Sequence, residues 1–388
     1  MHPTRSDPLA RFRDAAAARA AAGLKRALRP RAPGDPVIDV ASNDYLGLAR
    51  DPRPARAAAE AAIAWGTGST GSRLVTGSTT LHAELEEALR RFAGAPAALV
   101  FSSGYLANLA AVTVLSGRGT LVVSDEGNHA SIVDACRLSR ARVVVTPHKD
   151  VTAVEKALAD RDEEHALVVT DSVFSVDGDL APIAALHAAA VRQSALLLVD
   201  EAHAMGVVGE GGRGAVHAAG LAGDPRVVRT LTLSKSFGSQ GGAVLGPPEV
   251  IEALVDTGRP FIFDTGLAPA CAAAALTAVR IVEGAPELPG RARSIARELG
   301  AMVTGLGLPD PGLPAGAVVP VVLGRPQVAL RAVAICADHG VRAGCFRPPS
   351  VPEGRSCLRL TARADLGCDD LAVIKRALTA VSELKVNA

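Results

Sequence analysis

Residues 195–203 read Ala-Leu-Leu-Leu-Val-Asp-Glu-Ala-His, and this stretch decides the fold. Its apolar part is continuous rather than alternating, which is typical of a strand covered on both faces of a parallel sheet. Similar short runs recur from residue 97 to residue 245, most of them separated by helical patterns. The predicted strands are residues 97–101, 120–124, 142–146, 166–170, 195–200, 227–233 and 241–245. Repeated β-α-β units indicate an α/β protein with a mostly parallel central sheet flanked by helices.

The pattern differs at the two ends of the chain. Residues 9–28 form an amphipathic helical pattern, and a Pro- and Gly-rich linker follows at 30–36. After residue 280 the sequence predicts helices at 291–306 and 328–339, strands at 317–323 and 357–361, and a last helix. We therefore expect an N-terminal helix and linker (1–40), a large domain (41–280) and a smaller α+β domain (281–388). Helices are also expected at 108–115, 152–159 and 183–192, the second with a capping box at Thr152-Ala-Val-Glu155.

Composition excludes several classes of protein. The 388 residues carry 41 Lys and Arg against 40 Asp and Glu, so no overall charge favours nucleic acid or a membrane surface. No apolar run approaches the roughly 20 residues of a membrane span. The N-terminus is Arg-rich but lacks an apolar signal core, so we expect a cytoplasmic protein. Six widely spaced cysteines without a C-x-x-C pair predict neither a metal site nor a disulfide framework.

Lys235 stands apart from the other lysines of the chain. Only six lysines occur, and five have polar or helical surroundings typical of a solvated surface. Lys235 follows a predicted strand, in the uncharged run Ser234-Lys-Ser-Phe-Gly238. Such a setting lowers the pKa of an amine and suits a lysine that forms a Schiff base. An exposed loop lysine explains this position equally well.

Asp200 and His203 follow the most apolar strand of the chain. A carboxylate at the tip of a buried strand is costly unless it meets a cation, and a protonated pyridine nitrogen is one such cation. His203, three residues later, can face the same ligand. The alternative is an Asp that caps the next turn and a His that bonds a backbone carbonyl.

Three further positions are candidates for binding a ligand because of where they lie relative to the predicted strands and helices. Ser102-Ser-Gly-Tyr105 joins a strand to a helix and suits a phosphate, although such turns are common. No Walker loop or G-x-G-x-x-G motif competes with it. His129 can stack on a planar cofactor or cap a helix, and Arg359 can bind a carboxylate or form a surface ion pair. Together with Asp200, His203 and Lys235, these features are what pyridoxal 5′-phosphate (PLP) requires.

The chain resembles the α-oxoamine synthases, which are PLP-dependent transferases of fold type I, from about residue 10 to residue 385. The motifs that carry the resemblance are Ser42-Asn-Asp-Tyr-Leu-Gly47, Gly71-Ser-Arg-Leu-Val-Thr-Gly77, Phe101-Ser-Ser-Gly-Tyr105, His129-Ala-Ser131, Val173-Phe-Ser-Val-Asp-Gly178, Asp200-Glu-Ala-His203, Thr232-Leu-Ser-Lys235 and Arg347-Pro-Pro-Ser-Val-Pro352. Eight motifs in the same order make a chance match negligible.

The resemblance implies a role for each cofactor residue. Lys235 would bind PLP covalently and move the α-proton, and Asp200 would pair with the ring nitrogen. His129 would stack on the ring, and His203 and Ser175 would contact its hydroxyl. The phosphate would be bound by Ser103, Gly104, Tyr105 and Thr232. Ser234 stands where many relatives have glycine, a substitution we expect to be tolerated.

The resemblance also implies substrate contacts. Arg359 would bind the amino-acid carboxylate, with Asn43 and His129 lining the site. Ser350 stands where the family has a threonine for the acyl substrate, so the hydroxyl is kept and the methyl is lost. An N-terminal arginine of the family corresponds here to Lys25 or Arg26, and the sequence leaves this pair open.

The implied activity is decarboxylative condensation of an amino acid with an acyl thioester, in a homodimer with shared active sites. The motifs at 71–77 and 347–352 favour the branch that joins L-alanine to a pimeloyl thioester in biotin biosynthesis. Whether CoA or a carrier protein bears the pimeloyl group is left open. The alternatives are the glycine-using family members, serine palmitoyltransferase, a PLP aminotransferase, and a binding module in which Lys235 is incidental.

Overall fold

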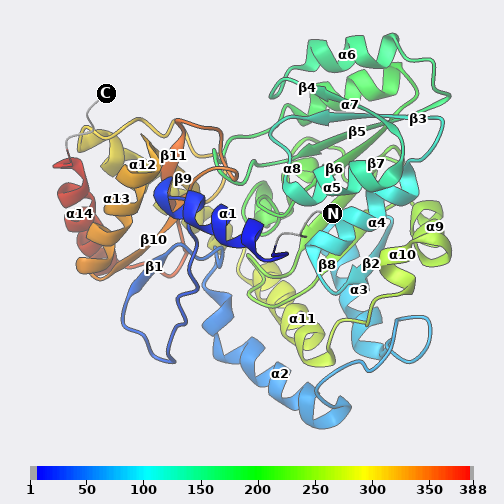
Figure 1. Ribbon diagram of the computed structural model, residues 1–388. Helices are drawn as coiled ribbons and strands as arrows, with labels where there is room; N and C mark the ends of the chain where they lie inside the picture. The colour runs from blue at the N-terminus through cyan, green and yellow to red at the C-terminus, as the bar shows by residue number, and fades with distance from the viewer. Residues whose placement is uncertain (1–6, 385–388) are drawn as a thin grey trace.

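A seven-stranded sheet forms the centre of the larger part of the molecule, and a four-stranded sheet forms the smaller part (Figure 1). The computed structural model describes residues 7–384. The large sheet has the order β2-β8-β7-β6-β5-β3-β4, in which only β8 is antiparallel to its neighbours. Its strands are β2 Ala97–Phe101, β3 Thr120–Asp125, β4 Arg142–Thr146, β5 His165–Asp171, β6 Leu196–Asp200, β7 Val227–Thr232 and β8 Gly242–Gly246. The α/β fold with a mostly parallel sheet is therefore confirmed.

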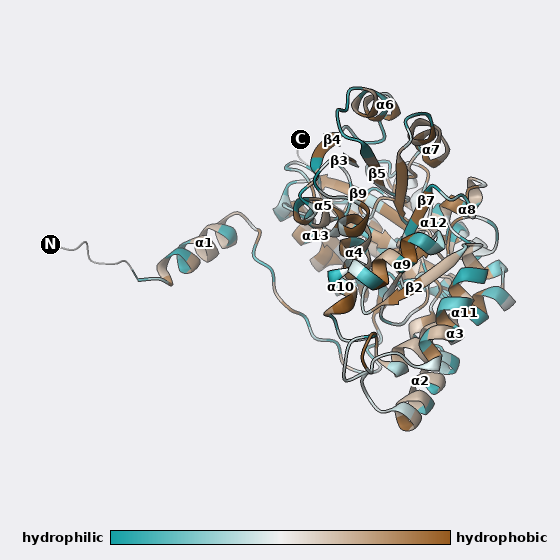
Figure 2. Cartoon of the chain, turned by 90° about the vertical axis from the view of Figure 1, so that its right-hand side faces the viewer, coloured by the Kyte–Doolittle hydropathy of each residue, from teal (hydrophilic) through white to brown (hydrophobic). Residues whose placement is uncertain are grey.

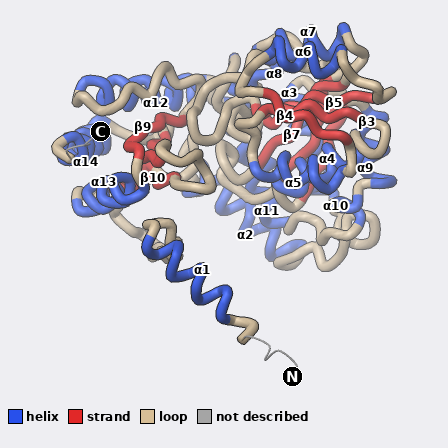
Figure 3. The backbone as a smooth tube through the Cα atoms, turned by 45° about the horizontal axis from the view of Figure 1, so that its top comes forward, coloured by secondary structure: helices blue, strands red, loops and turns tan. Residues whose placement is uncertain are grey.

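Helices cover both faces of the large sheet (Figure 3). Leu197 and Val199 of β6 belong to one apolar core, whereas Leu198 between them belongs to another. This double coverage explains why the strands are apolar at every position. The helices of this part are α2 Pro52–Trp65, α3 Thr80–Ala93, α4 Gly104–Leu115, α5 Ala130–Ser139, α6 Val151–Ala159, α7 Ile183–Arg192, α8 Ala215–Ala218, α9 Pro248–Thr257, α10 Arg259–Ile262 and α11 Pro269–Gly284, with 3₁₀ turns at Leu48–Arg50 and Glu210–Gly212.

The small sheet has the order β1-β10-β11-β9 and is backed by helices. Its elements are β1 Ile38–Val40, α12 Glu287–Gly305, β9 Val318–Gly324, α13 Pro326–Asp338, β10 Val341–Phe346, β11 Ser356–Thr361 and α14 Cys368–Ser382. The three-residue β1, within the expected linker region, pairs in parallel with β10. Neither strand was predicted from the sequence. The domain bounds themselves stay a prediction, and α11 runs through the expected boundary at residue 280.

The first helix lies away from the rest of the chain (Figure 2). It spans Ala10–Ala21, and none of its residues is buried. It is shorter than the expected 9–28, because the chain turns at Gly23 with φ +70°. Among residues 7–384, no helix combines the length and apolar character needed to cross a membrane.

The predicted capping box at Thr152 is wrong. Helix α6 begins at Val151, and its N-cap is Asp150, whose carboxylate accepts the backbone N–H of Ala153 at 2.9 Å. Asp150 takes this place because an ionised carboxylate at the N-cap also interacts favourably with the helix dipole. Thr152 therefore lies inside the first turn.

A buried ion pair joins the core strands to the helices behind them. Arg229 of β7 and Glu201, which follows β6, are 2% and 0% exposed in their side chains, with Nη1 and Oε2 3.5 Å apart. Arg229 also donates to the carbonyl of Ala93, and Glu201 accepts the N–H of Val216. Removing one partner would leave a buried charge without compensation.

We expect Arg229→Met to lower the free energy of unfolding by about 3–5 kcal/mol, since Glu201 would lose its cation. Urea unfolding followed by circular dichroism measures this loss. The control is Arg90→Met, which removes an exposed ion pair with Glu87 and should cost about 1 kcal/mol or less. Equal losses in the two variants would contradict the assigned role.

Candidate active site

The carboxyl ends of three parallel strands carry polar side chains in register. Asp171 of β5 pairs with Asp200 of β6, and Asp200 pairs with Thr230 of β7. Paired residues of neighbouring strands project on the same face, so these side chains form a row. All three are at least 94% buried. This is the edge at which open α/β sheets bind ligands.

Lys235 lies just beyond β7, where the charges of Asp200 and Asp171 act on its amine. Its Nζ is 2.7 Å from Nε2 of His203. Burial lowers the pKa of Lys235 to about 8, against the opposing effect of Asp200 and Asp171 and with a further lowering by Arg359. Of the two interpretations left open by the sequence, the partly enclosed amine beside His203 favours the functional one.

The other ring nitrogen of His203 contacts Tyr45. The Oη of Tyr45 is 2.5 Å from Nδ1 of His203 and donates to Oδ1 of Asn43 at 3.2 Å. Burial, with the charges of Lys235, Arg359 and His129, lowers the pKa of His203 well below its usual value, so the ring is neutral. Nδ1–H then donates to Tyr45, and Nε2 accepts from Lys235. Tyr45 belongs to the motif at 42–47, but no role was predicted for it.

Arg359 of β11 enters the site from the small sheet. Its two terminal nitrogens donate to Oδ1 of Asn43 and to the carbonyl of Ser175, each at 2.7 Å. Its guanidinium lies 4.5 Å from the ring centre of Phe346, and the residue is only 4% exposed. Within residues 7–384 it forms no ion pair, and its buried Nε has no hydrogen-bond partner. This is a cation held ready for an anion, not the surface ion pair considered as the alternative.

The N-terminus of α4 forms a close backbone cradle. Ser103 caps the helix by accepting the N–H of Leu106, which leaves the N–H groups of Gly104 and Tyr105 without acceptors among the described residues. A Cβ on Gly104 would lie 2.9 Å from Cβ of Thr232, so only glycine fits here. These free N–H groups and the hydroxyl of Thr232 suit a phosphate. The side chain of Tyr105 turns away and donates to Asp134.

His129 is the N-cap of α5 at the rim of the site and is partly open to solvent. Its Nδ1 accepts the backbone N–H of Ser131 at 3.3 Å, and the backbone N–H of His129 donates to Oδ1 of Asp171 at 3.4 Å. The enclosing protein lowers the pKa of His129, the charge of Asp200 opposes this, and Lys235 lowers it further. A neutral ring with an open face suits stacking on a planar group, in addition to the capping role that the sequence analysis considered.

These groups fit PLP, which carries a phosphate, an aldehyde and a pyridine nitrogen. The glycine cradle offers free N–H groups, Lys235 offers an amine with a lowered pKa, and Asp200 offers a buried carboxylate. The unpartnered Nε of Arg359 marks where a further anion can bind. No group of His, Cys, Asp and Glu within residues 7–384 has the arrangement of a metal site.

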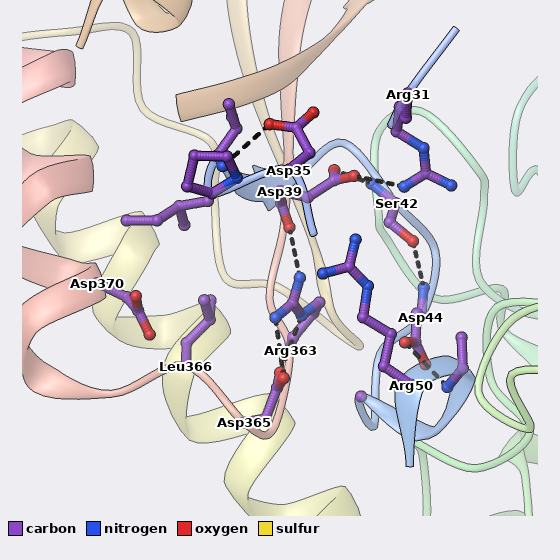
Figure 4. Close-up of a pocket in the computed structure, with 15 residues that line it drawn as sticks. Arg31, Asp35, Asp39, Ser42, Asp44, Arg50, Arg363, Asp365, Leu366 and Asp370 are labelled. Atoms are coloured by element: carbon purple, nitrogen blue, oxygen red, sulfur yellow. Dashed lines mark hydrogen bonds and ion pairs between the residues drawn. The ribbon is translucent and has the colours of Figure 1, made fainter. Parts of the chain in front are cut away.

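A cavity of about 360 Å³ lies beside the site rather than in it (Figure 4). Arg363 bonds the carbonyl of Asp39 at 3.2 Å and pairs with Asp365 at 2.9 Å, and Asp39 also pairs with Arg31 and Arg342. The N–H of Ala364 donates to the carbonyl of Tyr45. These ion pairs and hydrogen bonds fix the segment that carries Tyr45 and Asn43, and Asn43 contacts Arg359.

The family model for class I and II aminotransferases matches residues 35–378. A protein from Mycobacterium sp. (strain JLS) named 8-amino-7-oxononanoate synthase is 58% identical over 374 residues, which cover 96% of this chain and 97% of that protein. The protein of the same name from Mycobacterium ulcerans is 56% identical, covering 98% and 96%. The chain belongs to the 8-amino-7-oxononanoate synthase family. This family is PLP-dependent, so the predicted cofactor is confirmed.

Solved structures agree with this assignment. A serine palmitoyltransferase from Sphingomonas wittichii is similar with a TM-score of 0.91 and 30% identity, covering 97% of this chain and 98% of that one. An 8-amino-7-oxononanoate synthase from Francisella tularensis has a TM-score of 0.76 and 25% identity, covering 89% and 97%. The chain therefore shares the fold of both enzymes, and sequence identity assigns it to the 8-amino-7-oxononanoate synthases.

At the proposed acyl-substrate end of this family member, Arg26 and Ser350 come together. Nη2 of Arg26 donates to Oγ of Ser350 at 3.2 Å. Lys25 forms no side-chain hydrogen bond or ion pair within residues 7–384, and its carbonyl accepts from Arg347. That Ser350 and one of Lys25 and Arg26 bind the acyl substrate stays a prediction. The contact with Ser350 favours Arg26 over Lys25.

Proposed function

We propose that the chain condenses L-alanine with a pimeloyl thioester to give 8-amino-7-oxononanoate, carbon dioxide and the free thiol, a step of biotin biosynthesis in the cytoplasm. The observation that carries the proposal is the buried Arg359, whose charge acts on the pKa of Lys235, in a chain 58% identical to a protein of that name. An amino acid needs both its carboxylate held and its α-proton removed, and this pair supplies the two functions.

Each residue of the site has a separate role in binding or proton transfer. Arg359 binds the carboxylate of L-alanine, and Asn43 fixes the guanidinium. Lys235 would bind PLP through its amine, and as a free amine its Nζ would take the α-proton and later return a proton to the same carbon. Asp200 would compensate the positive ring nitrogen, His203 and Ser175 would contact the ring hydroxyl, and His129 would cover the ring face. When bound, PLP supplies the electron sink for the negative charge that develops at the α-carbon.

The bonds balance with one proton from water, which the departing thiolate takes up. The α-carbon of L-alanine bonds to the thioester carbonyl, and the C–S bond breaks to release the thiol. The carboxylate then leaves as carbon dioxide, and a proton takes its place. Arg26 and Ser350 lie where the acyl chain is proposed to bind.

Thiol release tests this function directly. The purified holoenzyme is given pimeloyl-CoA with L-alanine, glycine or L-serine, and a carrier-bound pimeloyl donor in a parallel set. We expect the fastest release with L-alanine. Release with glycine or L-serine alone would assign the chain to a sister activity, and palmitoyl-CoA with L-serine tests serine palmitoyltransferase, whose structures are similar. Amino exchange with an α-keto acid and no thiol would show an aminotransferase.

We also propose a homodimer with shared active sites. Large apolar side chains are exposed in α2, in the segment that follows it and after α10: Ile63, Trp65, Leu74, Val75 and Phe263 are 47–87% exposed. The N–H of Gly266 donates to the carbonyl of Gly71, which brings the segment of Phe263 to that of Leu74 and Val75. Exposed apolar groups of this size in neighbouring segments mark an interaction surface. Sedimentation equilibrium of the holoenzyme at the mass of one chain would contradict the dimer.

A further inference from the structure

Asn108 forms the centre of a buried hydrogen-bond network beneath the site. The residue lies on α4 and is 3% exposed. Its Oδ1 accepts from Oγ1 of Thr230 at 2.5 Å, and its Nδ2 donates to Oδ2 of Asp200 at 2.7 Å and to Oγ of Ser131 at 2.8 Å. A carboxylate accepts hydrogen bonds, so Nδ2 must face Asp200, and the orientation of the amide is fixed.

One arm of the network leads to Asp200. The other carboxylate oxygen of Asp200, Oδ1, accepts the N–H of Ala202 at 2.8 Å. Each oxygen of the carboxylate is therefore held by one donor, from Asn108 on one side and from the backbone on the other. Two fixed donors leave the carboxylate a single orientation for its partner.

The other arm leads to His129. The Oγ of Ser131 accepts from Asn108, which leaves its own proton for Nδ1 of His129, 2.7 Å away. Nδ1 also accepts the backbone N–H of Ser131. With two donors at Nδ1, the ring is neutral and carries its proton on Nε2. The backbone N–H and the hydroxyl of Ser131 together fix the tautomer of His129, and Asn108 holds that hydroxyl in place.

The same helix begins at the backbone cradle. Asn108 follows Gly104 by four residues, which is about one turn and about 6 Å along the axis. The amide that holds Asp200 is therefore at a fixed distance from the N–H groups that suit a phosphate. Helix α4 packs on β7 and β8, so this distance is rigid.

We propose that Asn108 is a positioning residue that holds the Asp200 carboxylate and the His129 ring in one fixed geometry relative to the N-terminus of α4. The inference rests on the proposed PLP site and is independent of the acyl substrate. Asn108 itself is buried beneath Asp200 and is assigned no contact with PLP.

PLP binding by the full-length apoenzyme tests the proposal. Asn108→Ala should raise the Kd for PLP by tenfold or more and change the visible absorption of the reconstituted enzyme. Asn108→Asp is nearly isosteric and places a second carboxylate against Asp200. We expect it to bind PLP more weakly than the wild type, because the amide N–H that holds Asp200 is replaced by a group of like charge.

The control is Thr113→Ala on the same helix, whose hydroxyl bonds only helix carbonyls. We expect its Kd to stay within twofold of the wild type.

An unchanged Kd and spectrum in Asn108→Ala would overturn the proposal, as would wild-type PLP binding by Asn108→Asp. If Asn108→Ala does not fold, Asn108→Asp and Ser131→Ala decide, because Ser131→Ala should change the spectrum through His129 alone. A wild type that binds PLP but releases no thiol would refute the proposed reaction and leave the role of Asn108 standing.

Discussion

Lys235→Ala is expected to lower kcat by about 10⁴-fold or more while the chain stays folded. The variant lacks both the amine that binds PLP covalently and the group that moves the α-proton, and positioned proton transfer alone contributes about 10²–10⁴-fold. Thiol release with L-alanine measures the loss, and circular dichroism checks the fold. Lys156→Ala, which removes an exposed lysine of α6, is the matched control and should keep full activity.

The lowered pKa of Lys235 also predicts the stability of this variant. The unfolded chain binds the proton with a pKa near 10.5 and the folded chain with one of about 8. The unfolded state therefore binds more protons between these values, so stability rises with pH there and the folded state bears the full cost below pH 8. Lys235→Ala removes this cost. Its apoenzyme should melt at or above the wild-type Tm at pH 7, and a clearly lower Tm would contradict the assigned environment.

Covalent uptake of PLP should follow the same pKa. At pH 8 about half of the Lys235 side chains are neutral, whereas an amine with a pKa of 10.5 would be neutral in about 1 of 300 molecules. The rate of uptake by wild-type apoenzyme should rise tenfold per pH unit below about 8 and level off above it. Stopped-flow absorbance between pH 6 and 10 measures this rate. An inflection near pH 10 would show an ordinary, solvated lysine.

The sequence predicted those parts of the fold that local patterns encode. The apolar run that ends at Asp200 is long enough to distinguish a buried strand, and a polar residue at its tip indicates the ligand edge. Strands β1 and β10 were missed because Ile38–Val40 is too short to show a period, and its pairing with β10 joins segments some 300 residues apart. Such long-range pairing leaves no local signal.

The sequence predicted the site residues whose own neighbourhood along the chain is unusual. It did not predict those whose role depends on contacts made by the fold. Lys235 and Asp200 are unusual in their own neighbourhoods. Asn108, by contrast, is an ordinary amide in an apolar helix pattern, and only the fold brings it to Asp200 and Ser131. The one available signal was a polar residue on the buried face of a predicted helix. Tyr45 was likewise quoted in a motif without a role, since its partner His203 is 158 residues away.

Arg359→Met is expected to raise KM for L-alanine by about 10²–10³-fold, with a smaller effect on the KM for pimeloyl-CoA. A buried charge pair that loses one partner typically costs 2–5 kcal/mol or more, or about 30- to 5,000-fold, and the expected change lies within these bounds. The carboxylate of L-alanine would then enter a site whose remaining donors are already used by other groups. Steady-state kinetics with each substrate varied in turn measure the two KM values.

Arg359→Lys separates charge from geometry. A lysine keeps the positive charge but lacks the planar fork that donates at once to Asn43 and to the carbonyl of Ser175 while Nε stays free. We therefore expect it to recover only part of the loss. Full recovery would show that charge alone is needed and that the fixed orientation is incidental.

Arg355→Met is the matched control for both variants. Arg355 lies four residues earlier and reaches the same 173–178 segment, where it pairs with Asp177 at 2.8 Å, but both side chains are about half exposed. Exposed pairs of this kind contribute about 1 kcal/mol or less, so both KM values should change by less than about fivefold. If Arg355→Met and Arg359→Met raised the KM for L-alanine equally, Arg359 would act by holding the segment in place. Because only Arg359 is buried with a free nitrogen, we expect the large effect to be confined to it.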